Sequence, residues 1–350
     1  MDSMTPASAV SVSTPGRSGR SRSRRLFVIG GALATAVAAG AAYRRLQAGR
    51  SAATTGASDD DGQLSLGWGE AVVASEPTTV STDDGADLAV WDYAGESADA
   101  PAVVLSHCWT GNHEIWVPVA RRLREQGYRV VLYDQRGHGV STLGTAPITV
   151  ELLAHDLATV LEATDVRGAV LAGHSMGGMS IMSLANHRSD ILHERARAVV
   201  LVATSATKVG NYPDPVLRRM AAPLVGSPAL TRAMASRNGH RFVRGVFGTE
   251  PVHAHMVLTA NAFARAHPGA RADFMVALST MDLLEGIATI QLPTTVIVGS
   301  RDTLTLPLKS DEMVATIPGA RLVTLPDKGH MLPLEDPDAV TDEIVRAIKG

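Results

Sequence analysis

A serine between two glycines, near the middle of the chain, is the sharpest chemical signal in the sequence. The turn Gly173-His174-Ser175-Met176-Gly177 follows the apolar run Ala169–Ala172 and precedes Met179–Ala185, whose apolar spacing is helical. In a strand–turn–helix context, Gly-x-Ser-x-Gly lifts the serine hydroxyl clear of the sheet and places it at a helix N-terminus. The motif alone arises by chance, but this context predicts that Ser175 is a nucleophile.

Four further motifs lie at or just after the ends of predicted strands. They are Ser106-His107-Cys108-Trp109, Asp134-Gln135-Arg136-Gly137-His138-Gly139-Val140-Ser141, Gly299-Ser300-Arg301-Asp302 and Gly329-His330. With the serine turn, they resemble the α/β-hydrolase superfamily over about residues 70–348, matching its oxyanion loop, its Asp-x-Arg-Gly-x-Gly-x-Ser turn, its acid and its histidine. The pattern looks like the esterase and monoacylglycerol-lipase branch, and the order Ser, Asp, His is the one that the superfamily uses.

The resemblance implies a catalytic triad and an oxyanion hole. A serine hydroxyl is a weak nucleophile, so a base must take its proton as it attacks an acyl carbon. His330 is expected to be that base, and Asp302 to fix its tautomer and stabilise the imidazolium. The backbone N–H groups of Trp109 and Met176 are expected to bind the oxyanion.

Other histidines and one other aspartate compete for the triad roles. His107, His138 and His174 lie in the motif loops, where the superfamily usually uses such residues to support loop geometry. None of the three follows the last predicted strand, so His330 is preferred as the base. Asp327 is the rival acid, but it lies three residues before His330 and not at a strand end.

Cys108 departs from the superfamily's pattern, which usually has glycine between the histidine and the oxyanion residue. A side chain there could narrow the acyl site, or its thiol could act as a nucleophile beside His107. A small buried residue in a tight loop is the favoured interpretation, because free cysteines are so often buried.

Short apolar runs alternate with helix-period segments along the body of the chain. The helical segments include Ile115–Gln126 and Ile148–Ala163. The strand-like runs are Leu88–Tyr93, Ala102–Ser106, Arg129–Tyr133, Ala169–Ala172, Ala198–Ala203, Thr294–Val298 and Arg321–Leu325. This alternation predicts the α/β class, with a mostly parallel, doubly wound sheet of about eight strands. Residues 67–96 instead predict two strands that turn at Asp83-Asp84-Gly85.

The alternation is interrupted once, over residues 205–288. That segment shows no clear strand, and it is too long for a loop. It predicts a helical cap over a hydrolase core formed by residues 67–204 and 289–350. Trp91 and Trp116 are expected in the core. The cap methionines suit either core packing, expected for most of them, or an adaptable apolar channel; they are Met220, Met234, Met256, Met275 and Met281.

Charge and cysteine usage exclude several classes of protein. The formal net charge is −3, but residues 1–50 carry eight arginines and one acid, so the remaining residues sit near −10. Such an acidic body makes nucleic acid an unexpected partner. A single cysteine excludes intrachain disulfides and cysteine-based zinc clusters. No metal or cofactor is expected.

The first fifty residues resemble a targeting segment rather than part of the folded domain. Residues 1–25 have a disordered composition, and Leu26–Tyr43 carries no charge. Arg24-Arg25 followed by Leu26-Phe27-Val28 resembles a bacterial twin-arginine export signal. An uncleaved membrane anchor is the rival for residues 26–43. Either interpretation places the catalytic domain outside the plasma membrane, joined through a linker over residues 51–66.

The expected substrate is a small-molecule or lipid ester with an apolar acyl or alcohol part. The same triad also serves carbon–carbon bond hydrolases, thioesterases, lactonases and cofactor-free haloperoxidases (perhydrolases), and the fold does not separate them. A binding protein with an idle triad and a membrane-anchored structural protein are the non-enzymatic alternatives. Enzymes with an aspartate nucleophile are disfavoured because Ser175 holds that position.

Overall fold

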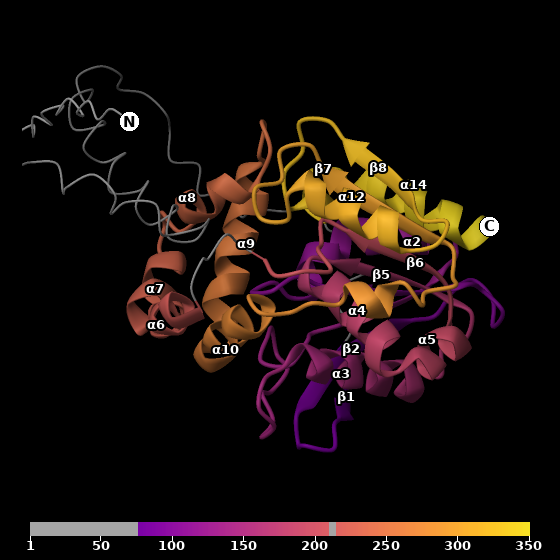
Figure 1. Ribbon diagram of the computed structural model, residues 1–350, viewed down its shortest axis with the longest axis horizontal. Helices are drawn as coiled ribbons and strands as arrows, with labels where there is room; N and C mark the ends of the chain where they lie inside the picture. The colour runs from indigo at the N-terminus through magenta and orange to yellow at the C-terminus, as the bar shows by residue number, and fades with distance from the viewer. Residues whose placement is uncertain (1–75, 210–214) are drawn as a thin grey trace, which may run out of the picture.

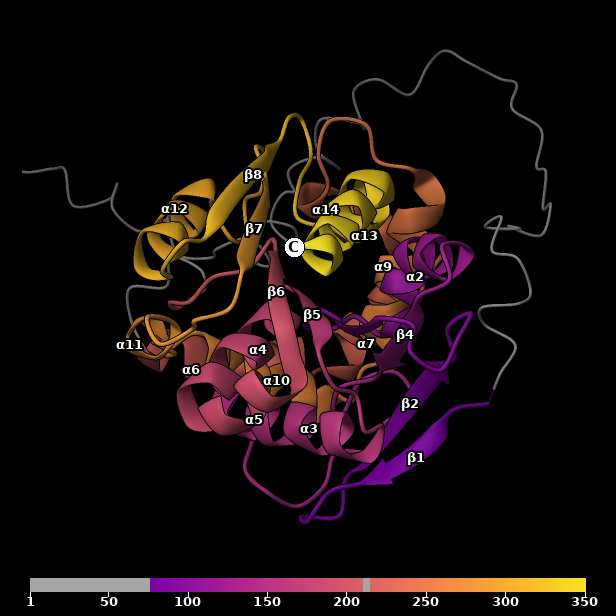
Figure 2. The same cartoon turned by 90° about the vertical axis from the view of Figure 1, so that its right-hand side faces the viewer.

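The computed structural model describes residues 76–209 and 215–350, and its centre is one eight-stranded sheet. The strand order is β1-β2-β4-β3-β5-β6-β7-β8, and only β2 runs against the others. Figure 2 shows this order as a twisted row from β1 to β8. The strands are β1 Thr78–Ser81, β2 Asp87–Tyr93, β3 Ala102–Ser106, β4 Arg129–Tyr133, β5 Ala169–His174, β6 Ala196–Val202, β7 Thr294–Gly299 and β8 Arg321–Leu325. The expected sheet of about eight mostly parallel strands is confirmed.

Helices cover both faces of this sheet, as a doubly wound fold requires. Along β3, Val103 and Leu105 belong to one buried cluster, while Ala102 and Val104 belong to the other. Because successive side chains of a strand point to opposite faces, a strand buried on both sides is apolar throughout. The first face packs against α2 and α14, and the second against α3, α4 and α5; these helices are α2 Val117–Glu125, α14 Pro337–Lys349, α3 Val150–Ala163, α4 Met176–His187 and α5 Ser189–Arg195.

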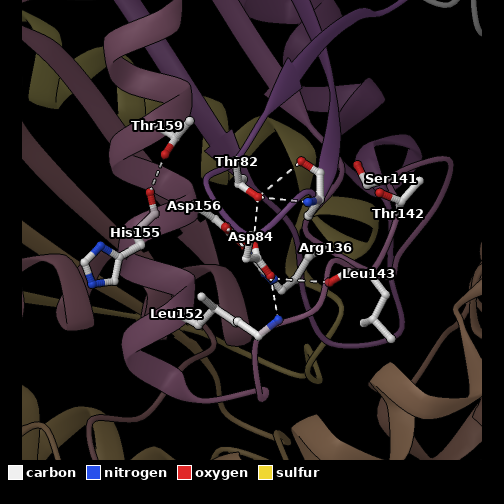
Figure 3. Close-up of polar contacts among 12 residues, drawn as sticks. Thr82, Asp84, Arg136, Ser141, Thr142, Leu143, Leu152, His155, Asp156 and Thr159 are labelled. Carbon is white, nitrogen blue, oxygen red and sulfur yellow. Dashed lines mark hydrogen bonds and ion pairs between the residues drawn. The ribbon is translucent and has the colours of Figure 1, made fainter.

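A buried arginine joins the first hairpin to the body of the fold. Arg136, which follows β4, is fully buried and binds two carboxylates (Figure 3). Its Nε and Nη2 each donate to Asp156 of α3 at 2.6 Å, and its Nη1 donates to Asp84 of the hairpin turn at 2.8 Å. Burial raises the pKa of Asp156, whereas the guanidinium lowers that of Asp84. The turn after β4 is therefore fixed from two sides.

A helical insertion leaves the sheet after β6 and returns at β7. In the described part of this segment the only strand-like pairing is an isolated bridge between Thr207 and Asp282. Figure 1 shows α6 to α10 gathered beside the sheet. We call the helices between β6 and β7 the helical insertion; they are α6 Pro215–Val225, α7 Pro228–Met234, α8 His240–Val243, η3 Arg244–Val246, α9 His253–Arg265, α10 Pro268–Leu278 and α11 Leu284–Ile287. The exact cap and core boundaries stay predictions.

Most large apolar side chains lie where the sequence places them. Trp91 and Trp116 are buried in the core. Four methionines of the insertion are buried as well, namely Met234, Met256, Met275 and Met281. Met220 differs, because its side chain is 71% exposed on α6 and packs no core.

The predictions for residues 1–50 and 51–66 lie outside the described residues. Over residues 76–209 and 215–350, every helix is too short or too polar to cross a membrane. The apolar segment 26–43 lies outside those residues, and its role stays a prediction.

Candidate active site

The turn that carries Ser175 is strained and held in place. Ser175 follows β5 and precedes α4 with φ 52° and ψ −113°, a region that side-chain-bearing residues rarely adopt. Its N–H donates to the carbonyl of Val202 at 2.9 Å, and its own carbonyl accepts from the Thr204 hydroxyl at 2.7 Å. Strain of this kind persists only where neighbouring contacts fix it, and it gathers at functional sites.

Two glycines let the turn approach the neighbouring backbone. A Cβ on Gly177 would lie 2.1 Å from the carbonyl oxygen of Ser106, at the end of β3. A Cβ on Gly173 would lie 2.4 Å from the carbonyl oxygen of Gly177. Neither position has room for a side chain, so the Gly-x-Ser-x-Gly pattern is a steric requirement of this turn.

Asp302 and His330 meet although they come from different loops. The Oδ2 atom of Asp302, after β7, lies 2.9 Å from Nδ1 of His330, after β8. Three donors hold the carboxylate: the N–H groups of Leu304 and Thr305 at Oδ1, at 2.8 and 2.9 Å, and the Thr305 hydroxyl at Oδ2, at 2.7 Å. Burial opposes the charge of Asp302, but His330 and these donors outweigh it and lower its pKa. Asp302 is therefore the ionised partner of the His330 imidazole.

Glu335 also supports the position of His330, a role that none of the sequence motifs predicts. Its Oε2 accepts from the N–H of Gly248 at 2.7 Å and of Gly329 at 3.0 Å, while Oε1 accepts from the N–H of Met331 at 3.0 Å. The N–H of His330 itself donates to the carbonyl of Val246 at 2.8 Å. The His330 loop is thus tied both to its own downstream helix α13 (Leu332–Glu335) and to the helical insertion.

The rival residues have other partners. His174 is buried and lies 2.8 Å, through Nε2, from the carbonyl oxygen of His330, and burial lowers its pKa to about 3. Burial also lowers the pKa of His107 to about 4 and that of His138 to about 3. Asp327 is exposed and pairs with Arg301 at 2.9 Å. These groups support the backbone around the site and do not meet Asp302.

The oxyanion loop is fastened to the serine helix by a buried glutamine. Gln135 receives a hydrogen bond from the Ser180 hydroxyl of α4 at 2.9 Å, and its Nε2 donates to the His107 carbonyl. Its N–H also donates to Nε2 of His107 at 2.8 Å. No hydrogen bond between described residues uses the N–H of Trp109 or Met176, the two expected oxyanion donors. Gln135 therefore holds the loop that carries Trp109 in position relative to α4, which begins at Met176.

Ser175 and His330 both face one cavity of about 420 Å³. Helices of the insertion provide much of its wall, through Met234, Phe242, Val243, Phe263, Met275 and Leu278. Within the described residues, no hydrogen bond joins the Ser175 hydroxyl to the His330 imidazole. Such contacts are often long before a substrate is bound, so the arrangement suits a pair that closes on substrate.

The sequence of motifs and the site geometry agree with a comparison against protein families. Residues 103–343 match the model described as "Alpha/beta hydrolase family". The chain belongs to this family. The match covers the β3 loop, the serine turn, Asp302 and His330, and it begins after the first hairpin of the sheet.

Known members of the α/β-hydrolase family resemble this hydrolase over most of their length. A bifunctional esterase/perhydrolase of Acinetobacter calcoaceticus is 25% identical over 77% of this chain and 99% of its own. A 3-oxoadipate enol-lactonase of Acinetobacter baylyi is 29% identical over 69% and 85%. Among solved structures, a hydrolase from Pseudomonas aeruginosa is 29% identical with a TM-score of 0.65, covering 79% of this chain and 99% of that one.

Cys108 lines the cavity of this α/β-hydrolase but is a poor candidate for a nucleophile. Its side chain is buried, and burial raises the pKa of the thiol to about 12. A neutral thiol is a weak nucleophile, since the thiolate is the reactive form. Two residues later, Thr110 has φ 61°, so strain is stored in this loop as well as at Ser175.

In the described part of the hydrolase, no group of three or more His, Cys, Asp or Glu residues is arranged to hold a metal ion. Backbone carbonyls contact one ring nitrogen each of His107 and His174.

Proposed function

We propose that this α/β-hydrolase is a serine hydrolase that cleaves a carboxylic ester through a covalent acyl-enzyme. The observation that carries the proposal is the Asp302–His330 pair, whose histidine lines the same cavity as Ser175 on its strained turn. In this proposal Ser175 is the nucleophile, His330 the general base and Asp302 the group that orients the imidazole. Because Asp302 accepts a hydrogen bond from Nδ1 of His330, the other ring nitrogen, Nε2, is left to receive the serine proton.

The two half-reactions use the same groups in reverse order. Ser175 attacks the acyl carbon while its proton passes to Nε2 of His330, which then delivers that proton to the leaving alcohol. Water next attacks the acyl-enzyme, gives its proton to the same nitrogen, and the acid leaves as Ser175 is restored. The N–H groups of Trp109 and Met176 bind the oxyanion in both steps, and one such donor is typically worth about 3 kcal/mol.

The cavity wall supports an ester with an apolar acyl or alcohol part. Apolar side chains of the helical insertion provide much of that wall, and burial of apolar surface is worth about 25 cal/mol per Å². The carboxylesterase and lipase type of substrate fits this surface.

Peracid formation is a second candidate because of one relative. The bifunctional esterase/perhydrolase of Acinetobacter calcoaceticus aligns with this chain over 99% of its own length. The same acyl-enzyme would serve, with hydrogen peroxide in place of water as the second nucleophile. Peracid release from a short carboxylic ester in the presence of peroxide tests this activity directly.

Labelling with a fluorophosphonate probe tests the proposed nucleophile. Wild-type protein should be labelled once, at Ser175, and Ser175→Ala should lose both labelling and hydrolysis of p-nitrophenyl esters. Ser236→Ala, an exposed serine of the insertion, is the matched control and should behave as wild type. Undiminished labelling or turnover in Ser175→Ala would overturn the assignment. A series of increasing acyl length then measures how far the apolar wall extends.

We also propose that residues 1–50 export the enzyme or anchor it outside the plasma membrane. The support is the sequence alone: Arg24-Arg25 precedes the uncharged stretch Leu26–Tyr43. The ester substrate would then be met outside the cytoplasm.

A further inference from the structure

The charged side chains that line the active-site cavity are all basic. They are Lys208 and Lys309, and no Asp or Glu of the described residues lines this cavity. Lys208 follows β6 by a few residues, and Lys309 lies in the first turn of α12 (Pro307–Thr316). Two separate segments thus bring positive charge to an otherwise apolar chamber.

Lys309 is held in position by its neighbours. Its Nζ donates to the Thr207 hydroxyl at 2.7 Å and to Oε2 of Glu312 at 3.0 Å. The Thr207 hydroxyl also donates to Oε2 of Glu312, at 3.1 Å. Glu312 therefore offsets one positive charge from outside the lining, and Thr207 ties α12 to the segment that carries Lys208.

Lys208 is exposed at the cavity, and no ion pair or hydrogen bond of its ammonium is found among the described residues. Counted over residues 76–209 and 215–350, the hydrogen-bonded carboxylate of Glu312 is set against the two ammonium groups, which leaves one positive charge. Leu306, which is 52% exposed and also lines the cavity, places apolar surface beside the lysines.

We propose that the enzyme prefers esters whose far end carries a carboxylate or another anion, which Lys208 and Lys309 bind. The inference rests on the proposed function, because it names the substrate class of the same site. A carboxylate buried in an apolar chamber is costly unless it is paired with a cation. A long apolar chain along the insertion's side chains, with its anionic end at the two lysines, satisfies both parts of the cavity.

Two esters of equal chain length isolate the end group. One is p-nitrophenyl octanoate, and the other is the mono-p-nitrophenyl ester of octanedioic acid, which replaces the terminal methyl with a carboxylate. The readout is the ratio of kcat/KM for the acid-ended ester to that for the neutral one. Lys208→Met should lower this ratio by about fivefold, the upper range for a partly exposed ion pair. Raising ionic strength should lower it in wild type by screening the charges.

Controls separate charge from folding and from the proposed chemistry. Lys208→Arg keeps the charge and should keep the ratio, and Lys349→Met, at the end of α14, should match wild type on both esters. Binding of the two esters to Ser175→Ala, measured by calorimetry, should show the same preference, and hydrolysis by this variant would count against the proposed nucleophile and not against the two lysines. An equal ratio in wild type, Lys208→Met and Lys309→Met, unchanged by salt, would overturn the proposal.

Discussion

The carboxylate of Glu335 accepts hydrogen bonds from the backbone on both sides of His330. The two donors, Gly329 and Met331, lie 3.0 Å from Oε2 and Oε1 respectively, and Gly248 of the insertion adds a third at 2.7 Å. A carboxylate that receives three N–H groups is an efficient clamp, because each charge-assisted bond is stronger than a neutral one. Glu335 thereby sets where the His330 ring stands relative to Asp302.

We expect Glu335→Gln to lower kcat severalfold and Glu335→Ala to lower it by about a hundredfold, with little change in KM. The glutamine keeps one acceptor oxygen, whereas alanine leaves the loop free to shift, and a small displacement of a catalytic group has a cost of that order. Steady-state kinetics on a p-nitrophenyl ester measures both constants. Glu250→Gln, on an exposed loop residue nearby, is the control. Equal loss in Gln and Ala variants, driven by KM, would contradict a positioning role.

The support of Asp302 predicts a graded series. Asp302→Asn should lower kcat by roughly 10⁴-fold, because the amide favours the wrong imidazole tautomer. Thr305→Val removes one donor of the carboxylate and should lower kcat by about tenfold while circular dichroism stays native. Thr303→Val, two residues earlier, provides the comparison. A Thr305→Val enzyme with full activity would show that the hydroxyl contact at 2.7 Å is not needed.

Buried neutral histidines make the fold sensitive to mild acid. Burial lowers the pKa values of His107, His138 and His174 to about 4, 3 and 3, below the usual 6.5. Between pH 6.5 and about 4 the unfolded chain therefore binds more protons than the folded one, so stability falls as pH falls.

Thermal unfolding across this range measures the effect. Tm should drop steadily from pH 7 to pH 4, and His138→Gln should flatten the decline because one proton-binding site is lost from the unfolded chain. His155→Gln replaces a half-exposed histidine and should leave the slope near that of wild type. A Tm independent of pH in this window would contradict the neutral state of these rings.

The thiol of Cys108 should be unreactive in the folded enzyme. Burial raises its pKa to about 12, so almost no thiolate is present at pH 8. Ellman's reagent should therefore report about one free thiol per chain only after denaturation. Cys108→Ala should keep fluorophosphonate labelling at Ser175. Rapid modification of the native protein, with loss of labelling, would instead make this cysteine part of the chemistry.

The proposed targeting role of residues 1–50 can be tested independently of catalysis. If Arg24-Arg25 act as a twin-arginine signal, replacing both with lysine should trap folded, active enzyme inside the cell. Mass spectrometry of the wild-type product should then show an N-terminus near Ala42, after Ala39-Gly40-Ala41. An intact N-terminus in the membrane fraction, indifferent to the lysine change, would establish the anchor.

The apolar runs predicted the strands, and the motifs predicted the loops after them, because both features depend on residues that are close together in the chain. Each predicted strand has a counterpart within a few residues, and the serine turn stands where Gly173 and Gly177 require it. Glu335 and Thr305 could not be predicted in this way. Glu335 acts through backbone atoms, including those of Gly248, which is distant in sequence, and backbone partners leave no pattern of residue types. The exposed side chain of Met220 likewise depends on how α6 packs.

The helical insertion starts and ends on neighbouring strands, since β6 pairs directly with β7. Another segment can therefore replace it without any change in the order or direction of the strands. The insertion's backbone hydrogen bonds to the His330 loop and to Glu335 use the main-chain atoms of Val246, Gly248 and Thr249. Gly248 is restricted in type, because a Cβ there would lie 2.1 Å from the carbonyl oxygen of Asp327, and the Thr249 hydroxyl adds a side-chain hydrogen bond to that oxygen at 3.3 Å. The side chains that the insertion adds to the cavity wall, such as Met234, Phe242 and Phe263, can thus change in evolution without moving the backbone atoms that hold the His330 loop.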